Sequence, residues 1–315
     1  MKTIRLHTFA TGLVLLLTVV PSSGCIREDR SGCLPETEGR YDVLKIMDTV
    51  TGRDITETGQ AGDAVLYLFS PDGTYAGRLS VNSERITHHT PVRLPDGALG
   101  RCHVSVWANA ETGQQLHIPA EGSRIEGRAV SLVGETGTED AYRMCPDDLF
   151  FGHMQLTSAG GESPEEVTIT RKNARMHITV RGLDGTLPAE RYYFTVRIPD
   201  DGYDFVGKPA AGTATVRRAG EFDANGDFST NGAFNLVHTD PSASETEVTV
   251  RLYEKSAVRA TDRLICSVTT GSDGRPISLP EGRTVNLLID IGSTAGIDVR
   301  TEITPWNEIY QWETW

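Results

Sequence analysis

Few groups of residues in this 315-residue sequence combine types and spacing that could support catalysis or metal binding. His88 and His89 are adjacent, so on a strand they would point to opposite faces and would rarely share one metal ion. Residues 223–227 (Asp-Ala-Asn-Gly-Asp) resemble the start of a calcium loop, but the glycine comes one position early and position twelve is Phe234. A turn is the better interpretation of this segment.

Catalytic motifs are absent from the sequence as well. Asp147 and Asp148 could form a pair of carboxylates, but no partner acid can be placed opposite them. The sequence contains no GxSxG elbow, P-loop, HExxH or GxGxxG motif. We therefore expect a protein that is not an enzyme and that needs no metal ion and no small-molecule cofactor.

The strongest chemical signal is Cys25. Lys2 and Arg5 precede an apolar run at 11–20, and Pro-Ser-Ser-Gly leads into Cys25. This layout is typical of a secretory signal, and the apolar run is too short for a membrane-spanning helix. The segment resembles the lipobox of bacterial lipoproteins, which predicts a signal peptide at 1–24 and acyl (palmitate) chains on Cys25. Ordinary secretion with nearby cleavage is the alternative.

Four further cysteines remain, and they allow three complete pairings (Cys33, Cys102, Cys145 and Cys266). The predicted compartment permits disulfides, and a Cys102–Cys145 bridge is one option. Cys102 and Cys266 share strand faces with aliphatic residues, which favours core positions for both. The pairing stays open.

The net charge of the chain argues against some classes of binding partner. Lys and Arg number 30 and Asp and Glu number 43, so the formal net charge is −13. This acidity argues against nucleic acid, because phosphate binding needs clustered cations. Anionic lipid head groups would also repel an acidic protein, so we expect the folded part to be held away from the membrane surface.

Alternation of period two dominates the rest of the chain and predicts many short strands. The expected strands are 41–47, 64–69, 102–108, 128–133, 166–170, 174–181, 192–198, 213–217, 234–237, 247–253, 264–268 and 284–291. Strands at this density, with Gly, Pro and Asp turns, predict an all-β fold of two tandem antiparallel Greek-key β-sandwiches. Residues 134–165 are expected to be loop-like, with a short helical turn at 140–149. The predicted parts are a linker at 25–40, sandwiches at 41–163 and 164–304, and a tail at 305–315.

The C-terminal end carries the candidate partner site. Residues 297–304 alternate apolar and polar side chains, and three of the four tryptophans lie in the last ten positions. Chain ends are usually polar unless they dock somewhere, and aromatic residues are favoured interface anchors. The candidate partner-binding residues are Ile297, Val299, Ile303, Trp306, Tyr310, Trp312 and Trp315. Residues 297–304 could equally be the last strand of the chain's own second sandwich.

Four segments together resemble the fimbrial anchor and minor-subunit lipoproteins of Bacteroidales, the FimB-type proteins of type V pili. They are Cys25 to Pro35, the strand at 103–109, Asp-Asp-Leu-Phe-Phe-Gly at 147–152, and 175–183. The resemblance implies two transthyretin-like sandwiches on an outer-membrane lipid anchor, exposed at the surface at the base of a fimbrium.

The resemblance also implies how such a protein would act. A C-terminal strand would complete the sheet of a neighbouring pilin subunit, and the anchor would limit fimbrial length. The anchor would keep its own strand at 41–47, so no functional cleavage is expected after Arg40. The alternatives are a tip or accessory adhesin subunit and a glycan-binding surface lipoprotein.

Overall fold

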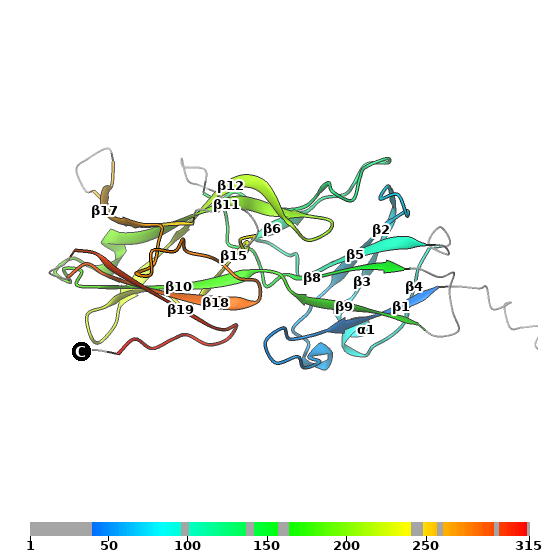
Figure 1. The fold of residues 1–315 in the computed structure, drawn as a ribbon, viewed down its shortest axis with the longest axis horizontal. Coiled ribbons are helices and arrows are strands. Elements are labelled where there is room, and N and C mark those ends of the chain that lie inside the picture. Colours follow the sequence, from blue (N-terminus) through cyan, green and yellow to red (C-terminus); the bar gives the residue numbers. More distant parts are fainter. Residues whose placement is uncertain are drawn as a thin grey trace, which may run out of the picture. The chain divides into compact units, whose positions relative to one another are not determined.

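The computed structural model describes residues 40–95, 101–136, 142–156, 164–240, 248–256, 261–292 and 296–313. Cys25, Cys33 and the predicted signal peptide lie outside these ranges. Strands dominate the described chain, which confirms the all-β fold class (Figure 1). The described helices are short: α1 (Ser83–Thr87) and two single 3-10 turns, η2 (Thr56–Thr58) and η4 (Ala189–Arg191).

One sheet has seven strands in the order β3-β2-β5-β8-β9-β1-β4. Their bounds are β1 Tyr41–Ile46, β2 Ala64–Phe69, β3 Tyr75–Val81, β4 Val92–Arg93, β5 Cys102–Ala108, β8 Phe150–Leu156 and β9 Glu165–Arg171. Alternate residues of these strands form one core, which includes Leu44, Leu66, Val104 and Val167. Ile86 of α1 also belongs to this core.

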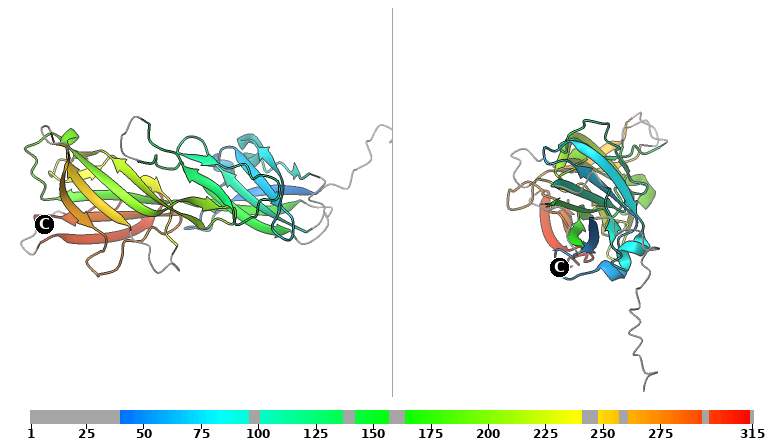
Figure 2. Two further views of the ribbon diagram at one scale, coloured as in Figure 1. Left: turned by 90° about the horizontal axis from the view of Figure 1, so that it is seen from above. Right: turned by 90° about the vertical axis from the view of Figure 1, so that its right-hand side faces the viewer.

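Two six-stranded sheets form the rest of the described chain. The first has the order β13-β14-β10-β18-β19, with β15 also paired to β10, and the second has the order β17-β16-β11-β7-β6, with β12 also paired to β11. Their bounds are β6 Gln114–Leu116, β7 Arg128–Leu132, β10 Ala174–Arg181, β11 Tyr192–Asp204, β12 Pro209–Arg218, β13 Gly220–Phe222, β14 Phe228–Thr230, β15 Phe234–Leu236, β16 Thr249–Glu254, β17 Arg263–Val268, β18 Arg283–Asp290 and β19 Asp298–Pro305. Figure 2 shows β18 and β19 side by side, in orange and red.

The second core joins parts of the chain that are far apart in sequence. It contains inward residues of β10 and β18, such as Ile178 and Leu287, and inward residues of β11, such as Phe194. Trp107 of β5 also belongs to it and lies 5.4 Å, ring centre to ring centre, from Tyr203 of β11. Tyr67 of β2 belongs to it too, whereas Leu66 and Val104 belong to the first core, so β2 and β5 use both faces for packing.

Three pairings of the described strands cross the predicted division of the chain, and one of them joins β8 to β9, with Phe150 opposite Arg171. β7 pairs with β11, with Ser131 opposite Gly202. β9 pairs with β1, with Val167 opposite Leu44. The boundary between residues 163 and 164 remains a prediction.

The expectation for residues 134–165 was wrong in two respects. Residues 150–156 form strand β8, which pairs with β5 along seven positions. Gly152 has no side chain and so interrupts the side-chain alternation of β8. Glycine is needed there, because a Cβ would lie 2.3 Å from the carbonyl oxygen of Thr168. The helical turn expected at 140–149 does not form in its described part, where Arg143 instead bridges Gly134.

Most pairings between the described strands are antiparallel, as predicted, but two of them are parallel. β1 runs parallel to β9, and β10 runs parallel to β18. Side chains alternate between faces in the same way in both arrangements, so the sequence pattern alone could not reveal this difference.

Candidate interaction surfaces

The first strand is fixed inside its sheet. β1 lies between β9 and β4, and it buries Leu44 and Ile46. Directly before it, the side chain of Arg40 is only 1% exposed and forms an ion pair with Glu165, the first residue of β9. The start of β1 is therefore held by an ion pair of a buried arginine as well as by strand pairing.

Asp42 is a second buried charge at the start of β1. It is fully buried, and neither carboxylate oxygen has a hydrogen-bond partner in the described structure. Burial raises the pKa of Asp42 to about 6, with Arg40 acting in the opposite direction and Glu165 adding to the rise. The carboxylate is therefore a destabilising group at neutral pH.

At the other end of the chain, β19 pairs with β18 along its whole length. It is the last strand in the order of its sheet, so its outer edge has no strand partner among the described residues. Only Val299 is buried, while Ile303 is 48% exposed and Ile297, just before the strand, is 51% exposed. An edge strand with exposed aliphatic side chains is a template for pairing with another chain.

The tail after Pro305 turns back and docks on its own chain. Trp306 is 5% exposed, and its ring lies 5.2 Å from the guanidinium carbons of both Arg171 and Arg175. Its carbonyl accepts hydrogen bonds from Arg175 Nη1 at 3.0 Å and from the Thr284 hydroxyl at 2.7 Å. Trp306 thus has cation–π contacts and hydrogen bonds at one site.

Beyond Trp306 the contacts are mainly polar. The Tyr310 N–H donates to Asn286 Oδ1 at 3.0 Å, and Arg181 donates to the Glu313 carbonyl at 3.3 Å. The rings of Tyr310 and Trp312 are 4.8 Å apart, in an edge-to-face arrangement. Figure 1 shows the tail running back past β19 toward the C-terminal mark.

The structure separates the seven candidate partner-binding residues into groups. Val299 and Trp306 are buried against their own chain, and Ile297, Ile303 and Tyr310 are exposed. Trp312 has intermediate exposure, and Trp315 lies outside the described residues. Whether the exposed members bind a partner stays a prediction.

Sequence reasoning missed the two arginines that hold Trp306. Arg175 lies in the predicted strand 174–181, but nothing in the sequence links it to a residue 131 positions away in the chain. Arg171 was not singled out at all. It also pairs with Asp148 at 3.1 Å and lies over the ring of Phe150. No local signal could have identified this contact.

The aspartate clusters have structural roles in the described chain. Asp147 accepts hydrogen bonds from the backbone of Glu111 and Thr112 and from the side chain of Gln114. Although burial opposes the effect, these bonds lower the pKa of Asp147. Asp223 accepts from the backbone N–H groups of Asn225 and Asp227, so this segment is a turn. The carboxylates of Asp147 and Asp223 therefore stabilise loops through these hydrogen bonds.

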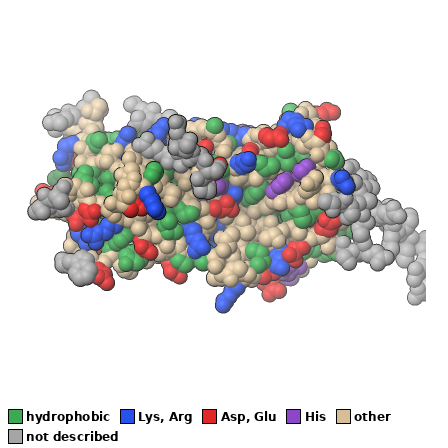
Figure 3. Space-filling view, viewed as in Figure 1, with side chains coloured by type: hydrophobic (Ala, Val, Ile, Leu, Met, Phe, Trp, Pro, Cys, Tyr) green, Lys and Arg blue, Asp and Glu red, His purple; other side chains and the backbone are tan. Residues whose placement is uncertain are grey.

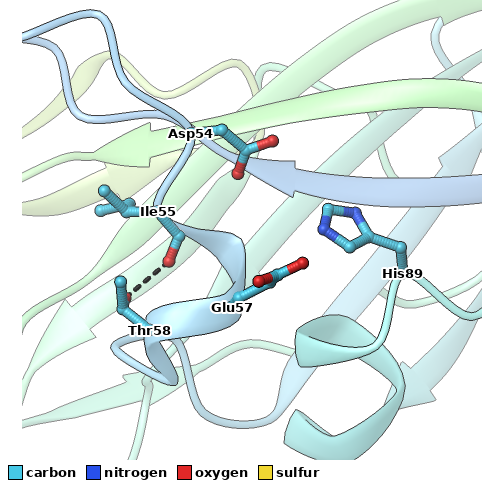
Figure 4. A pocket seen from close by; sticks show the side chains of 5 residues that line it. All are labelled: Asp54, Ile55, Glu57, Thr58 and His89. Carbon is cyan, nitrogen blue, oxygen red and sulfur yellow. Dashed lines mark hydrogen bonds between the residues drawn. The ribbon is translucent and has the colours of Figure 1, made fainter.

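A small pocket lies between η2 and α1. Figure 4 shows Asp54, Glu57 and His89 turned toward the same space. Hydrogen bonds from the Thr56 hydroxyl and backbone lower the pKa of Asp54. In the described ranges, no group of three His, Cys, Asp or Glu side chains is arranged to hold a metal ion. The pocket therefore does not point to metal chemistry.

Three cysteines lie in the described structure, Cys102, Cys145 and Cys266, and no disulfide joins any two of them. The Cys102–Cys145 bridge does not form. Cys102 and Cys266 are buried, as the sequence indicated. Burial raises the pKa of all three thiols, which disfavours the reactive thiolate.

Two general features of the surface bear on partners. Acidic and basic side chains are interspersed over the face shown in Figure 3, so that face has no continuous basic track for a nucleic acid. None of the described helices is long and apolar enough to cross a bilayer.

Comparisons with known proteins agree on one family. The family described as fimbrillin-A associated anchor proteins Mfa1 and Mfa2 matches residues 35–312. The major fimbrium anchoring subunit FimB of Porphyromonas gingivalis is 24% identical over 318 residues, which covers 96% of this chain and 97% of FimB.

Two solved structures share the fold. The fimbrial anchor protein Mfa2 of P. gingivalis has a TM-score of 0.58 at 15% identity, covering 85% of this chain and 97% of that one. A DUF1812 protein from Bacteroides thetaiotaomicron has a TM-score of 0.62 at 14% identity, covering 87% of this chain and 98% of that one.

Proposed function

Because the chain belongs to the family of fimbrillin-A associated anchor proteins, we propose that it is a non-enzymatic lipoprotein that anchors a fimbrium at the cell surface. The observation that supports this most is the match to the family over residues 35–312. The similarity to FimB extends over nearly the full length of both chains, so it is not limited to one module. Cys25 would carry the acyl chains that attach the protein to the outer membrane.

The arrangement of β1 is consistent with an anchor. A subunit that accepts a donated strand needs a gap in its sheet, and here β1 itself fills the position between β9 and β4. The ion pair between the buried Arg40 and Glu165 would add to its retention. The chain would therefore donate a strand without accepting one, which is the arrangement expected at the base of a fimbrium. A tip subunit would show the opposite behaviour.

The C-terminal end is the proposed contact with the first pilin subunit. Strand addition supplies main-chain hydrogen bonds, and alternate side chains fill pockets in the partner. Ile297 and Ile303 are exposed along β19, and Tyr310 is exposed in the docked tail. An anchor bound to the first subunit would end the fibre at its base, and in this way it would limit fimbrial length.

The test uses cells that make the full-length lipoprotein, a Cys25→Ala variant, or a chain that ends at Trp306. Protease shaving of intact cells, pull-down and mass spectrometry would report surface exposure and bound pilins. We expect Cys25→Ala to lose the surface-exposed protein, and the shortened chain to stay on the surface without capturing pilin. A lipidated, exposed protein with no pilin partner would overturn the proposal.

A matched pair of point variants sharpens the test. Ile303→Lys places a charge on the exposed side of the β19 edge, where Ile303 is 48% exposed. Ile118→Lys makes the same change in the loop after β6, where Ile118 is 64% exposed. Loss of pilin capture only in Ile303→Lys would support the edge of β19 as the contact, and equal capture by both variants would exclude it.

A further inference from the structure

Two histidines, one on β5 and one on β8, lie side by side on the seven-stranded sheet. Val104 and Val106 of β5 point into the first core, so His103 and Ser105 point to the opposite face. On β8, His153 lies directly opposite Ser105, which places it on the same face as His103 and diagonal to it. The three polar side chains therefore form a triangle across two paired strands.

The imidazole rings of His103 and His153 are close enough to share one metal ion. Their centres are 5.4 Å apart, and their planes are within 5° of parallel. A Zn–N bond is about 2.0–2.1 Å long, so two imidazoles on one tetrahedral ion have ring centres roughly 5 Å apart. His153 is exposed, and rotation about its χ2 torsion can aim a ring nitrogen at the shared position.

Neither ring is engaged elsewhere in the described chain. No hydrogen bond or ion pair holds either imidazole there, and His103 Nδ1 is a buried nitrogen without a partner. Ser105 is fully buried, and its hydroxyl has no hydrogen-bond partner either. By contrast, the rings of His88, His117 and His238 each form a hydrogen bond of 2.8–3.0 Å. Because buried polar atoms are nearly always paired, two unpartnered ones at neighbouring positions indicate a bound ligand.

We propose that His103 and His153 bind one divalent transition-metal ion of the kind that imidazole prefers, which is Zn²⁺, Cu²⁺ or Ni²⁺. Each ring supplies one nitrogen ligand, and water completes the coordination shell. The Ser105 hydroxyl forms a hydrogen bond with a metal-bound water, as groups around a metal site commonly do. This inference does not depend on the fimbrial role.

The same side chains argue against a hard cation. Ca²⁺ and Mg²⁺ need several oxygen ligands, and in the described ranges no group of three His, Cys, Asp or Glu side chains is arranged to hold a metal ion. Two protein nitrogens with bound water are therefore the most that this site offers. The expectation that the chain needs no metal ion rested on local motifs, which cannot reveal a pair formed across two strands.

The test uses the chain from residue 26 onward, purified without a histidine tag and treated with EDTA. Calorimetric titration with Zn²⁺ should show one site, and electron paramagnetic resonance of the Cu²⁺ form should show two coordinated nitrogens. His103→Gln and His153→Gln should each weaken Zn²⁺ binding by roughly tenfold or more, because each removes one of the two protein ligands. Zn²⁺ should raise the melting temperature of the wild type but not of these two variants, since a ligand that binds only the folded state stabilises it.

The matched control is H88Q/H89Q, which changes the other pair of neighbouring histidines and should bind Zn²⁺ as tightly as the wild type. A wild-type chain that binds neither Zn²⁺ nor Cu²⁺ would overturn the proposal. Unchanged binding in His153→Gln would overturn it too, as would a loss of binding in H88Q/H89Q, which would place the ion at the end of α1. His153 is exposed, so His153→Gln carries the test if circular dichroism shows that His103→Gln does not fold.

Discussion

The guanidinium of Arg40 forms an ion pair with the carboxylate of Glu165, and so joins the residue before β1 to the first residue of β9. The arginine side chain is 1% exposed, while the glutamate is 33% exposed. Breaking such a pair costs more than forming it contributes, because a buried charge is left without a partner. The pair therefore ties together two strands that are 125 residues apart in the chain.

This pair predicts resistance to proteases that cut after arginine. Such a protease must bind the arginine side chain in its own pocket, which a buried Arg40 does not allow. Limited digestion with trypsin, followed by mass spectrometry, should show no cut between Arg40 and Tyr41 while the exposed Arg53 is cut. Glu165→Ala should expose the bond after Arg40. Early cleavage there in the intact folded protein would contradict the prediction.

Asp42 predicts a pH-dependent stability. Its pKa is raised from 3.8 to about 6, so between these values the folded state binds more protons than the unfolded state. Stability should therefore fall as pH rises from 4 to 6, by about 3 kcal/mol from this group.

Asp42→Asn should remove this penalty, because the amide carries no charge. We expect the variant to be more stable than wild type by roughly 1–3 kcal/mol at pH 8 and to lose its advantage near pH 4. Urea unfolding at the two pH values measures this. A variant that is less stable than wild type at pH 8 would show that the carboxylate contributes favourably.

Trp306 predicts a large effect on stability at the chain end. The ring is 5% exposed and lies against two guanidinium groups, so Trp306→Ala should cost about 3 kcal/mol or more. Trp312→Ala removes the same side chain at a position of intermediate exposure, and should cost clearly less. Denaturant unfolding of both variants compares the two sites. Equal losses would mean that the arginine contacts do not fix Trp306.

The strands were largely predictable because their side-chain alternation is local information. Strands β2, β5 and β10 begin and end at the predicted residues, and β19 differs from the prediction by one residue at each end. β8 was missed because Gly152 interrupts its alternation. The parallel pairing of β1 with β9 could not be predicted, because parallel and antiparallel strands show the same alternation. The positions of most strands could thus be predicted from the sequence, but which strands pair with one another could not.

The same distinction between local pattern and long-range contact applies to the candidate partner-binding residues. The alternation that places Val299 and Ile303 on one face of β19 could be read from the sequence, but not the difference in exposure that leaves Val299 buried and Ile303 48% exposed. The docking of Trp306 could not, because it depends on arginines more than 100 positions away.

The last prediction concerns the attachment of β7 to β11. A Cβ on Gly202 would lie 1.9 Å from the Val130 carbonyl oxygen, so Gly202→Ala must push β7 away from β11. We expect a loss of roughly 1–3 kcal/mol or more, the usual cost of overpacking. Gly77 of β3 has nothing within 4 Å of its Cβ position, and Gly77→Ala should be neutral or stabilising by up to about 1 kcal/mol, since it restricts the unfolded chain. The melting temperature should therefore fall for Gly202→Ala, and it should rise or stay unchanged for Gly77→Ala. A Gly202→Ala variant as stable as wild type would mean that β7 can move away from β11 without cost.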